Sequence, residues 1–549
     1  MAVSIKVSHL NIVALGQGGE DLPIVNDVSF QIATGEVLAL IGESGSGKTT
    51  IALALMGYAR PGCRIDGGSV HIGETDILGL AASEQRHLRG RTVSYIAQSA
   101  AASFNPSRTL MDQVVESAHI HRLMSRAEAE VKAVALFRDL GLPNPQTIGQ
   151  RYPHQVSGGQ LQRLMAAMAL ITDPALVILD EPTTALDVTT QIEVLQAFRR
   201  VVRERDTTAL YVTHDLAVVA QMADRILVLR HGSQCELAST QQIIEAPQDV
   251  YTQSLLAAAR PVPRDAGHAE RDATNTPLLE VSGLIAGYGR PDAQGLPSSP
   301  VLIDINLTLH RGHSLGIIGE SGSGKSTLAR VIAGLVAPAR GRILFNGEPL
   351  EPVVAQRSRD ALRRIQIVFQ MADTALNPAH TIENILARPL QLYHGIKGDT
   401  LRKRVAHLLD LVQLPTTVAQ RLPDGLSGGQ KQRINLARAL AAEPDLILCD
   451  EVTSALDTVV GAAILDLMAQ LRRELGVSYI FISHDLRLVS SFCDRVLVMY
   501  AGKVVEELRA SNLAQAQHPY TQGLFNCLPK IEGGTRPLPT LQRDAEWAR

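Results

Sequence analysis

The amino-acid sequence contains one ordered set of motifs twice, and this internal repeat limits what the chain can fold into more than any other feature. The two glycine-rich motifs place their lysines 277 positions apart, and the SGGQ serines and the later histidines are each 270 positions apart. A repeat that keeps its order and spacing over such a distance indicates that two whole domains are duplicated. The four motif pairs are GESGSGKTT (42–50) and GESGSGKST (319–327), SGGQLQR (157–163) and SGGQKQR (427–433), LDEPTTALD (179–187) and CDEVTSALD (449–457), and THDL (213–216) and SHDL (483–486).

The repeat predicts two domains joined by a linker. At about 150 residues per compact unit, a chain of 549 residues is too long for a single small fold. The stretch near Ala257–Pro277 is rich in Ala, Pro and small polar residues and has no periodic apolar face, which is typical of a linker. About 20 residues of coil span about 25 Å, so we expect the halves to pair within one chain. The predicted segments are a first domain at 1–256, a linker at 257–277, a second domain at 278–530 and a tail at 531–549.

Composition argues against several classes of protein. The 52 Lys and Arg residues and the 55 Asp and Glu residues leave a formal net charge of −3, which does not favour a nucleic-acid partner. The five cysteines form no CxxC pair, so we expect no disulfide framework or metal cluster, and a reducing cytosol is the natural compartment. No leader pattern opens the sequence, and its apolar runs stop well short of the roughly 18 residues that cross a bilayer. Any membrane role is therefore expected to depend on partners.

Short apolar runs beside the motifs predict an α/β core in each half. These runs are continuously apolar, which is typical of buried parallel strands. The pattern predicts a three-layer α/β sheet with catalytic groups at the carboxyl ends of its strands. The predicted strands are Val37–Ile41, Ala175–Leu179, Ser314–Ile318 and Leu446–Leu448, and the helices expected to continue the glycine-rich loops are Ile51–Met56 and Leu328–Ile332.

The glycine-rich motifs match GxxxxGK[ST] and predict a phosphate-binding loop in each half. Glycines let the backbone wrap closely around an anion, and successive N–H groups supply positive potential. Lys48 and Lys325 are expected to neutralise the β- and γ-phosphates. A glycine turn without a ligand is the alternative, but the motif occurs twice between an apolar strand and a helix. The expected nucleotide contacts are Gly42, Ser44, Gly45, Gly47, Lys48, Thr49 and Thr50, and Gly319, Ser321, Gly322, Gly324, Lys325, Ser326 and Thr327.

An Asp-Glu pair ends an apolar strand in each half, at Asp180 with Glu181 and at Asp450 with Glu451. A carboxylate at a strand end can hold Mg²⁺ through water, and its neighbour can orient and deprotonate the attacking water. Adjacent acids alone also occur in ordinary acidic turns. Repetition beside an apolar strand, with TxALD following, favours catalysis.

The phosphate loop, SGGQ, the strand-end Asp-Glu pair and the downstream histidine together resemble the ATPase domains of ABC transporters, over nearly the whole chain. SGGQ is the specific element, because ordinary P-loop NTPases lack it. The resemblance implies an α/β fold of two tandem P-loop NTPase domains of ABC ATPase type, each with a RecA-like core and a helical subdomain. It also implies ATP and Mg²⁺ as cofactors.

In that family two domains stack head to tail, and the signature of one caps the nucleotide held by the other. A serine hydroxyl and glycine N–H groups at a helix start agree with this role, since they form an anion site. The alternative is that SGGQ merely begins a helix. The resemblance implies that Ser157, Gly159 and Gln160 complete the Lys325 site, and that Ser427, Gly429 and Gln430 complete the Lys48 site.

The resemblance assigns roles to three further pairs of residues. Gln98 and Gln370 match the glutamine loop, which contacts Mg²⁺ and the attacking water. His214 and His484 match the histidine that contacts the γ-phosphate, and Asp187 and Asp457 match an aspartate at the dimer interface. The expected catalytic residues are Glu181, Glu451, His214, His484, Gln98 and Gln370, and the expected metal contacts are Thr49, Gln98, Asp180, Ser326, Gln370 and Asp450.

Finer patterns are similar to the ATPase subunits of dipeptide, oligopeptide and nickel importers, here fused into one polypeptide. The family's aromatic residue that stacks on adenine is matched by Tyr288, whereas the region near Leu15 has none. Stacking contributes about 1 kcal/mol, so the Lys48 site is predicted to hold nucleotide more weakly. The supporting motifs are Phe104-Asn105-Pro106, Leu376-Asn377-Pro378, Tyr152-Pro153-His154, Tyr251-Thr252-Gln253 and Tyr520-Thr521-Gln522.

Several departures from the importer pattern leave the catalytic groups in place. Val156 stands where the family usually has Leu, and Gln155 and Gly425 where the importers commonly have Glu, which bears on contact with the permease. Val452 replaces the usual Pro after the second Asp-Glu pair. Both sites are therefore expected to hydrolyse ATP.

The resemblance implies an ATP-hydrolysing subunit at the cytoplasmic face of the cell membrane, driving an importer of peptides or related small solutes. Two transmembrane permease subunits are the implied partners, with an extracytoplasmic solute-binding protein acting indirectly. The alternative is a soluble twin-cassette ATPase acting on ribosomes or DNA, but the long charged linker or zinc insertions expected of such a protein are missing from the sequence. A module that binds ATP without cleaving it is disfavoured by two complete catalytic sets. The sequence does not distinguish peptide, nickel-chelate, glutathione or opine-like cargo.

Overall fold

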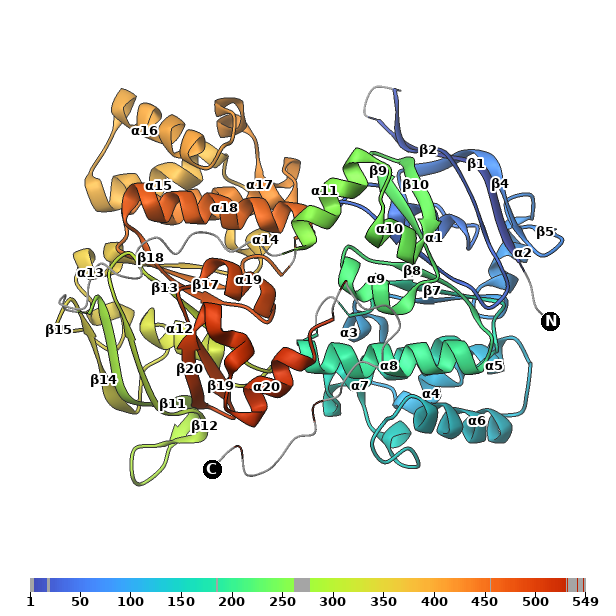
Figure 1. Cartoon of the computed structure of the whole chain (residues 1–549), viewed down its shortest axis with the longest axis horizontal. Coiled ribbons are helices and arrows are strands. Elements are labelled where there is room, and N and C mark those ends of the chain that lie inside the picture. The colour runs from blue at the N-terminus through green and yellow to red at the C-terminus, as the bar shows by residue number, and fades with distance from the viewer. Residues whose placement is uncertain are drawn as a thin grey trace. The chain divides into compact units, whose positions relative to one another are not determined.

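The computed structural model describes residues 4–16, 20–183, 186–260, 277–454, 456–529, 531, 541 and 547. The chain divides into two compact units, principally Met1–Arg260 in the first and Pro261–Leu456 with Val460–Leu528 in the second (Figure 1). Most of the predicted linker (257–277) and of the predicted tail (531–549) lies outside the described residues. The four segment boundaries therefore stay predictions.

The first unit contains two sheets. A four-stranded antiparallel sheet has the order β2-β1-β4-β5, and a six-stranded sheet has the order β10-β9-β3-β8-β7-β6, in which only β10 runs antiparallel to its neighbour. β3, β7 and β8 are buried along their whole length, as their continuous apolar sequences predict. The strands are β1 (Ile5–Leu15), β2 (Asp21–Ile32), β3 (Val37–Ile41), β4 (Cys63–Ile72), β5 (Thr75–Asp76), β6 (Val93–Ile96), β7 (Leu176–Asp180), β8 (Thr208–Val212), β9 (Arg225–Arg230) and β10 (Ser233–Ser239).

Helices of the first unit fall into two groups. Those from α3 to α7 lie between β6 and β7 in the sequence and form the predicted helical subdomain; Figure 1 shows α4 to α7 gathered at the far end of the unit from β1 and β2. The others connect strands or follow the last strand. The helices are α1 (Lys48–Ala54), α2 (Ala82–Leu88), α3 (Ala100–Ser103), α4 (Leu110–Val114), α5 (Glu116–Ile120), α6 (Arg126–Asp139), α7 (Gly158–Leu170), α8 (Val188–Glu204), α9 (Leu216–Met222), α10 (Thr240–Glu245) and α11 (Val250–Ala259), with short 3-10 turns at Ile148–Gln150 and Pro153–Gln155.

The second unit repeats this architecture. Its sheets have the orders β12-β11-β14-β15 and β16-β17-β18-β13-β19-β20. The strands are β11 (Leu279–Pro291), β12 (Pro297–Leu309), β13 (Ser314–Ile318), β14 (Arg340–Phe345), β15 (Glu348–Pro349), β16 (Ile365–Val368), β17 (Leu446–Asp450), β18 (Ser478–Ile482), β19 (Arg495–Tyr500) and β20 (Lys503–Arg509). The helices are α12 (Lys325–Ile332), α13 (Arg359–Arg364), α14 (Ala372–Ala375), α15 (Ile382–His394), α16 (Gly398–Leu411), α17 (Gly428–Leu440), α18 (Thr458–Leu475), α19 (Leu486–Phe492) and α20 (Pro519–Asn526), with 3-10 turns at Val354–Gln356, Thr416–Gln420, Pro423–Gly425 and Ala510–Gln515.

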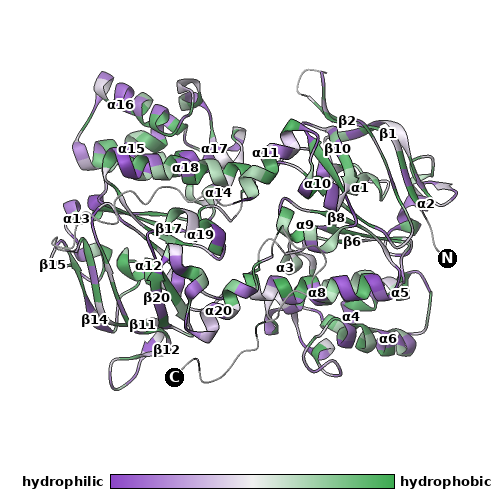
Figure 2. Cartoon of the chain, viewed as in Figure 1, coloured by the Kyte–Doolittle hydropathy of each residue, from purple (hydrophilic) through white to green (hydrophobic). Residues whose placement is uncertain are grey.

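Each unit has its own apolar core, where the antiparallel sheet, the helix after the phosphate loop and the six-stranded sheet meet. In the first unit Leu10, Ile51 and Ile178 represent these three elements, and all are fully buried. Leu284, Leu328 and Leu448 hold the corresponding places in the second core and are also fully buried. The strands of the six-stranded sheets are mostly green in Figure 2, whereas the outer helices α6 and α16 carry many purple residues. The predicted α/β core is thus confirmed in both units, and the four-stranded antiparallel sheet is a layer that the sequence analysis did not predict.

The helices after the phosphate loops begin earlier than predicted. α1 begins at Lys48 rather than at Ile51, and α12 begins at Lys325 rather than at Leu328. The preceding glycines, Gly47 and Gly324, have φ of 92° and 103°, and their left-handed backbone turns the chain directly into each helix. Both lysines therefore occupy the first helical position.

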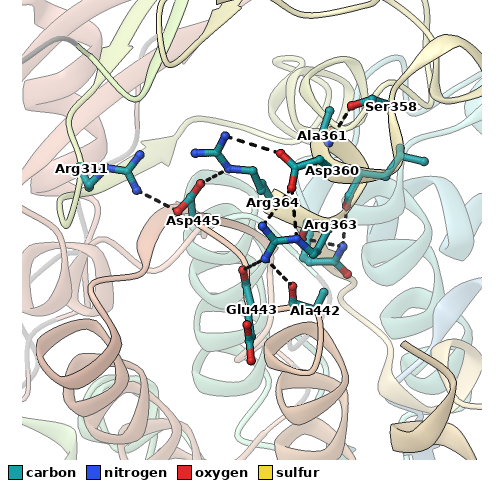
Figure 3. Close-up of polar contacts among 11 residues, drawn as sticks. Arg311, Ser358, Asp360, Ala361, Arg363, Arg364, Ala442, Glu443 and Asp445 are labelled. Atoms are coloured by element: carbon teal, nitrogen blue, oxygen red, sulfur yellow. Dashed lines mark hydrogen bonds and ion pairs between the residues drawn. The ribbon is translucent and has the colours of Figure 1, made fainter. Parts of the chain in front are cut away.

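The second unit has an ion-pair cluster near the start of β17, shown in Figure 3. Asp445 accepts from Arg311 at 2.8 Å and from Arg364 at 2.5 Å, and Arg363 donates to the carbonyl oxygen of Glu443 at 3.0 Å. These charges lie at the amino ends of the parallel strands, so they brace the sheet at the edge opposite the catalytic motifs. The equivalent first-unit positions, counted from the strand starts, are the uncharged residues Thr34, Thr92 and Ala175.

In the described parts of the chain, no helix has the length and apolar character needed to span a membrane.

Candidate active site

The loops that follow β3 and β13 each begin at a position where only glycine can be accommodated. Gly42 has φ of 150°, and a Cβ there would lie 2.1 Å from the carbonyl oxygen of Leu229. Gly319 has the same φ, and its Cβ would lie 2.2 Å from the carbonyl oxygen of Met499. A side chain cannot be accommodated at such distances, so the close packing of the loop against the next strand explains the first glycine of each motif.

Each loop lysine is buried and held by its own loop. Lys48 Nζ donates to the carbonyl oxygens of Gly42 and Glu43, both at 2.7 Å. Lys325 Nζ makes the equivalent bonds at 2.7 and 2.8 Å. Burial lowers the pKa of Lys48, while the charge of Glu181 opposes this shift. The ammonium groups lie within the loops, where phosphate oxygens can compete with the carbonyls for them.

The hydroxyl after each lysine contacts the aspartate that ends a neighbouring strand. Thr49 Oγ1 lies 3.1 Å from Asp180 Oδ1, and Ser326 Oγ lies 2.8 Å from Asp450 Oδ1. Burial raises the pKa of both aspartates, although the hydroxyl bonds oppose the shift. A hydroxyl and a carboxylate supply the oxygen ligands that Mg²⁺ prefers. Within the described segments there is no group of three or more His, Cys, Asp and Glu residues that could hold a metal ion.

Three predicted catalytic side chains of the first unit meet beyond the ends of the strands. Glu181 Oε2 accepts from Gln98 Nε2 at 3.0 Å, and Glu181 Oε1 lies 3.0 Å from His214 Nδ1. Glu181 has φ of 47°, and its N–H donates to the carbonyl oxygen of Val212 at 2.8 Å. The left-handed backbone directs the carboxylate away from the strand and toward the other two groups. A carboxylate held in this way can act on a water molecule at the same edge of the sheet.

The second unit repeats the cluster with one looser contact. Glu451 Oε2 accepts from Gln370 Nε2 at 2.8 Å, but Glu451 Oε1 and His484 Nδ1 are 3.6 Å apart. Burial by itself lowers the pKa of each histidine, but the hydrogen bond and charge of the glutamate outweigh it. The pKa values of His214 and His484 are therefore raised, which favours the imidazolium form near an anionic ligand.

The SGGQ residues begin α7 and α17. Ser157 Oγ accepts from Gln160 N at 3.3 Å, and Gln160 Oε1 accepts from Ser157 N at 3.0 Å; Ser427 and Gln430 form the same capping box at the same distances. A Cβ at Gly159 would lie 2.2 Å from Thr190 Cγ2, so this helix packs closely on α8. The motif thus has a local structural role in its own unit, and the predicted capping of the opposite nucleotide stays a prediction.

Tyr288 lies in β11 close to the second phosphate loop. Its hydroxyl is 3.4 Å from Thr327 Oγ1, and 44% of the residue is exposed. An exposed ring beside the loop is available for stacking on a base. In the first unit, Leu15 near the end of β1 is exposed as well, but it is aliphatic.

Sequence reasoning missed three tyrosine hydroxyls at these sites. Tyr95 donates to Asp180 Oδ2 at 2.6 Å, and its repeat position holds Ile367, so the duplication gave no signal. Tyr251 and Tyr520 accept from backbone N–H groups of the two phosphate loops. Their Tyr-Thr-Gln motifs were visible in the sequence, but nothing there indicated which loop the rings would reach.

The fold and the two clusters define a tandem ATPase of the P-loop class. The phosphate loop, the strand-end carboxylates, the glutamine and the histidine of each unit come from the same edge of its six-stranded sheet. This is the arrangement needed to bind a triphosphate and direct water at its last phosphate.

Comparison with known proteins identifies the family. The ABC transporter family matches residues 25–184 and 302–454, and the family described as "Oligopeptide/dipeptide transporter, C-terminal region" matches residues 505–546. The chain is 39% identical over 560 residues to the glutathione import ATP-binding protein GsiA of Salmonella choleraesuis strain SC-B67, covering 96% of this chain and 89% of that protein. It is 37% identical over 566 residues to GsiA of Escherichia coli strain K12, covering 96% and 90%.

Among solved structures, cbiO1 from Clostridium perfringens, part of the ABC transporter complex cbiONQ, aligns with 30% identity and a TM-score of 0.38. The alignment covers 44% of this chain and 91% of that one.

The chain belongs to the ABC transporter family and is an ATP-binding ATPase subunit of the tandem type. This confirms the predicted fold class, enzyme class and family resemblance. ATP is its nucleotide, and membrane permease partners follow from membership. The comparisons favour transport and give no support to a ribosome- or DNA-acting ATPase.

Proposed function

We propose that this chain energises an importer of glutathione or other short peptides. The observation that carries the proposal is the oligopeptide/dipeptide transporter C-terminal region at 505–546, combined with two complete catalytic sets. The names of the GsiA relatives support the same class of cargo. The partners proposed are two transmembrane permease subunits and, indirectly, an extracytoplasmic solute-binding protein, with this chain at the cytoplasmic face of the membrane.

In the proposed cycle the two units close head to tail on two ATP molecules. Ser157, Gly159 and Gln160 then cap the nucleotide at Lys325, and Ser427, Gly429 and Gln430 cap the one at Lys48. The γ-phosphate joins the units, so hydrolysis releases them and drives the permease.

At each site the chain's own groups bind the triphosphate and direct water. Lys48 neutralises phosphate oxygens, Glu181 orients and deprotonates the attacking water, and His214 contacts the γ-phosphate; Lys325, Glu451 and His484 act in the same way. Thr49, Asp180 and Gln98, with Ser326, Asp450 and Gln370, would hold Mg²⁺, which when bound neutralises charge on the phosphates.

The test is ATP hydrolysis by the complete complex in lipid vesicles. We expect stimulation by the solute-binding protein loaded with glutathione or a short peptide, and none by the empty protein. Purification under mild detergent should recover two multi-span proteins with this chain. Recovery of ribosomal RNA or DNA instead, or stimulation only by a nickel chelate, would overturn the proposal.

A further inference from the structure

A tyrosine near the end of each unit reaches the phosphate loop of the same unit. Tyr251, in α11, accepts a hydrogen bond through Oη from Glu43 N at 3.1 Å. Tyr520, in α20, accepts the equivalent bond from Glu320 N at 2.9 Å. The two tyrosines are only 6% and 0% exposed, so both bonds are largely shielded from water. The same contact therefore forms twice, from helices far from the loops in sequence.

The turn before each of these helices is fixed by a glutamate on the preceding strand. Glu236, in β10, accepts from the backbone N–H groups of Gln248 and Asp249 at 3.0 and 3.1 Å. Glu506, in β20, accepts from those of Gln517 and His518 at 2.7 and 3.3 Å.

Side chains at the helix starts add a second constraint. Asp249 accepts from the N–H groups of Tyr251 and Thr252, and His518 Nδ1 accepts from that of Tyr520. Several hydrogen bonds thus fix the backbone that carries each tyrosine.

In each unit the tyrosine hydroxyl and the lysine bind the two peptide groups that flank one loop residue. In the first unit, Glu43 N donates to Tyr251 while Glu43 O accepts from Lys48 Nζ. In the second, Glu320 N donates to Tyr520 while Glu320 O accepts from Lys325 Nζ at 2.8 Å. The tyrosine and the phosphate-binding lysine therefore hold one loop residue from its two ends. Loss of the hydroxyl leaves a backbone donor without this partner and frees the residue to turn.

The rings have different neighbours in the two units. The guanidinium of Arg230 lies over the Tyr251 ring, 4.8 Å from its centroid. The Tyr520 ring packs against Tyr500 at 4.6 Å and against Trp547 at 5.8 Å. Trp547 is the single tryptophan of the sequence, so its fluorescence reports on the surroundings of Tyr520.

We propose that Tyr251 and Tyr520 are positioning residues that preorganise the two phosphate loops for the nucleotide. Each hydroxyl fixes the loop residue whose carbonyl oxygen holds the lysine, so the loop is already in place when the β-phosphate arrives. The second loop is also connected through Tyr520 to Trp547. The inference concerns nucleotide binding alone and does not depend on the proposed cargo.

The test is MgADP binding by the full chain, because ADP lacks the γ-phosphate proposed to close the units. In a Lys48→Ala background, which leaves the second site, Tyr520→Phe should raise the calorimetric Kd for MgADP about 3- to 10-fold, as expected for one lost hydrogen bond. MgADP should also change the Trp547 emission, with its midpoint raised by the same factor in Tyr520→Phe. In the otherwise wild-type chain, the KM for ATP should rise while kcat stays nearly unchanged.

Tyr251→Phe in the same background is the matched control, since it removes the same atom from the other loop and should leave this Kd unchanged. Trp547→Phe should abolish the emission signal without changing the Kd. In a Lys325→Ala background the roles exchange, and Tyr251→Phe should now raise the Kd.

Unchanged MgADP affinity in both tyrosine variants overturns the proposal. A lower Tm of the nucleotide-free variant with unchanged MgADP affinity also overturns it, because this result shows a purely structural role. Should Tyr520→Phe fail to fold, the Tyr251→Phe arm decides the question alone.

Discussion

The two units carry the same catalytic motifs but surround the strand-end aspartate differently. Asp180 accepts from Thr49 and also from Tyr95, at 3.1 and 2.6 Å. Asp450 accepts from Ser326, and Ile367 occupies the position of Tyr95 in the neighbouring strand. Tyr95 pairs with the third residue of β7, and Ile367 with the third residue of β17, so the two positions are structurally equivalent. The two sites therefore differ although their motifs match, because residues outside the motifs determine the polarity around each strand-end aspartate.

A second difference concerns the side of each phosphate loop on which a base-stacking ring is predicted. Tyr288 lies beside the second loop, whereas the first unit has aliphatic side chains in that region. The first site thus has the better-supported aspartate, and the second has the aromatic ring. We therefore expect the first site to bind Mg²⁺ more tightly than the second, and the second site to bind nucleotide more tightly than the first.

The largest expected effect tests whether the sites are equivalent in catalysis. Glu181→Gln and Glu451→Gln each remove a base, which typically costs 10²- to 10⁴-fold at the altered site. In the proposed cycle a γ-phosphate at each site joins the units, so the uncleaved ATP at the altered site should keep them closed. Each single variant should therefore retain far less than half of the wild-type steady-state ATPase rate while still binding ATP. A single variant with half of the wild-type rate would show independent sites. Wild-type hydrolysis in the double variant would remove both residues from the role of base.

The next effect concerns Tyr95 and the proposed magnesium site. Tyr95→Phe removes the hydrogen bond that favours ionised Asp180, so the Mg²⁺ concentration for half-maximal ATPase should rise about tenfold, in the range typical of groups that support metal ligands. The measurement is a Mg²⁺ titration of ATP hydrolysis. Ile367→Val is the matched control at the equivalent position and should leave the titration unchanged. An unchanged titration in Tyr95→Phe would show that the hydroxyl does not support the metal.

Much of both sites was predictable from the sequence, and the reasons differ by residue. Glu181 was identified from its place at a strand end, and Gln98 and His214 from the family resemblance; the hydrogen bonds show that the three side chains meet. The contact of Tyr95 with Asp180 could not be predicted from the repeat, because the equivalent position in the second unit holds Ile367.

Other features depend on tertiary contacts that no local pattern encodes. The Tyr251 hydroxyl reaches Glu43 across 208 positions of sequence. The start of α1 at Lys48 depends on the backbone of Gly47, since a propensity argument places the helix where the apolar residues begin. The capping of one unit's nucleotide by the other unit's signature still rests on family resemblance.

A smaller effect is expected from the aromatic ring of the second site. Tyr288→Leu removes stacking worth about 1 kcal/mol, so the ATP affinity of the second site should fall about fivefold. The measurement is nucleotide binding in the Lys48→Ala background, and Leu15→Ala in the Lys325→Ala background is the control, expected to have little effect. If Tyr288→Leu binds ATP as tightly as its parent, the ring does not contact the base.

The smallest effect is a pH dependence that compares the two histidines. The pKa of His214 is raised in the folded chain, above the value of about 6.5 in the unfolded chain. The pairing of His214 with Glu181 therefore stabilises the nucleotide-free protein fully below about pH 6.5. This stabilisation is lost as the pH rises through the folded pKa. The Tm difference between wild type and His214→Gln should therefore be largest at about pH 6 and shrink toward pH 9. The difference for His484→Gln should be smaller throughout, because its Nδ1 lies 3.6 Å from Glu451 rather than 3.0 Å. A Tm difference that grows with pH would mean that the neutral imidazole, and not the imidazolium, is the form that the folded site favours.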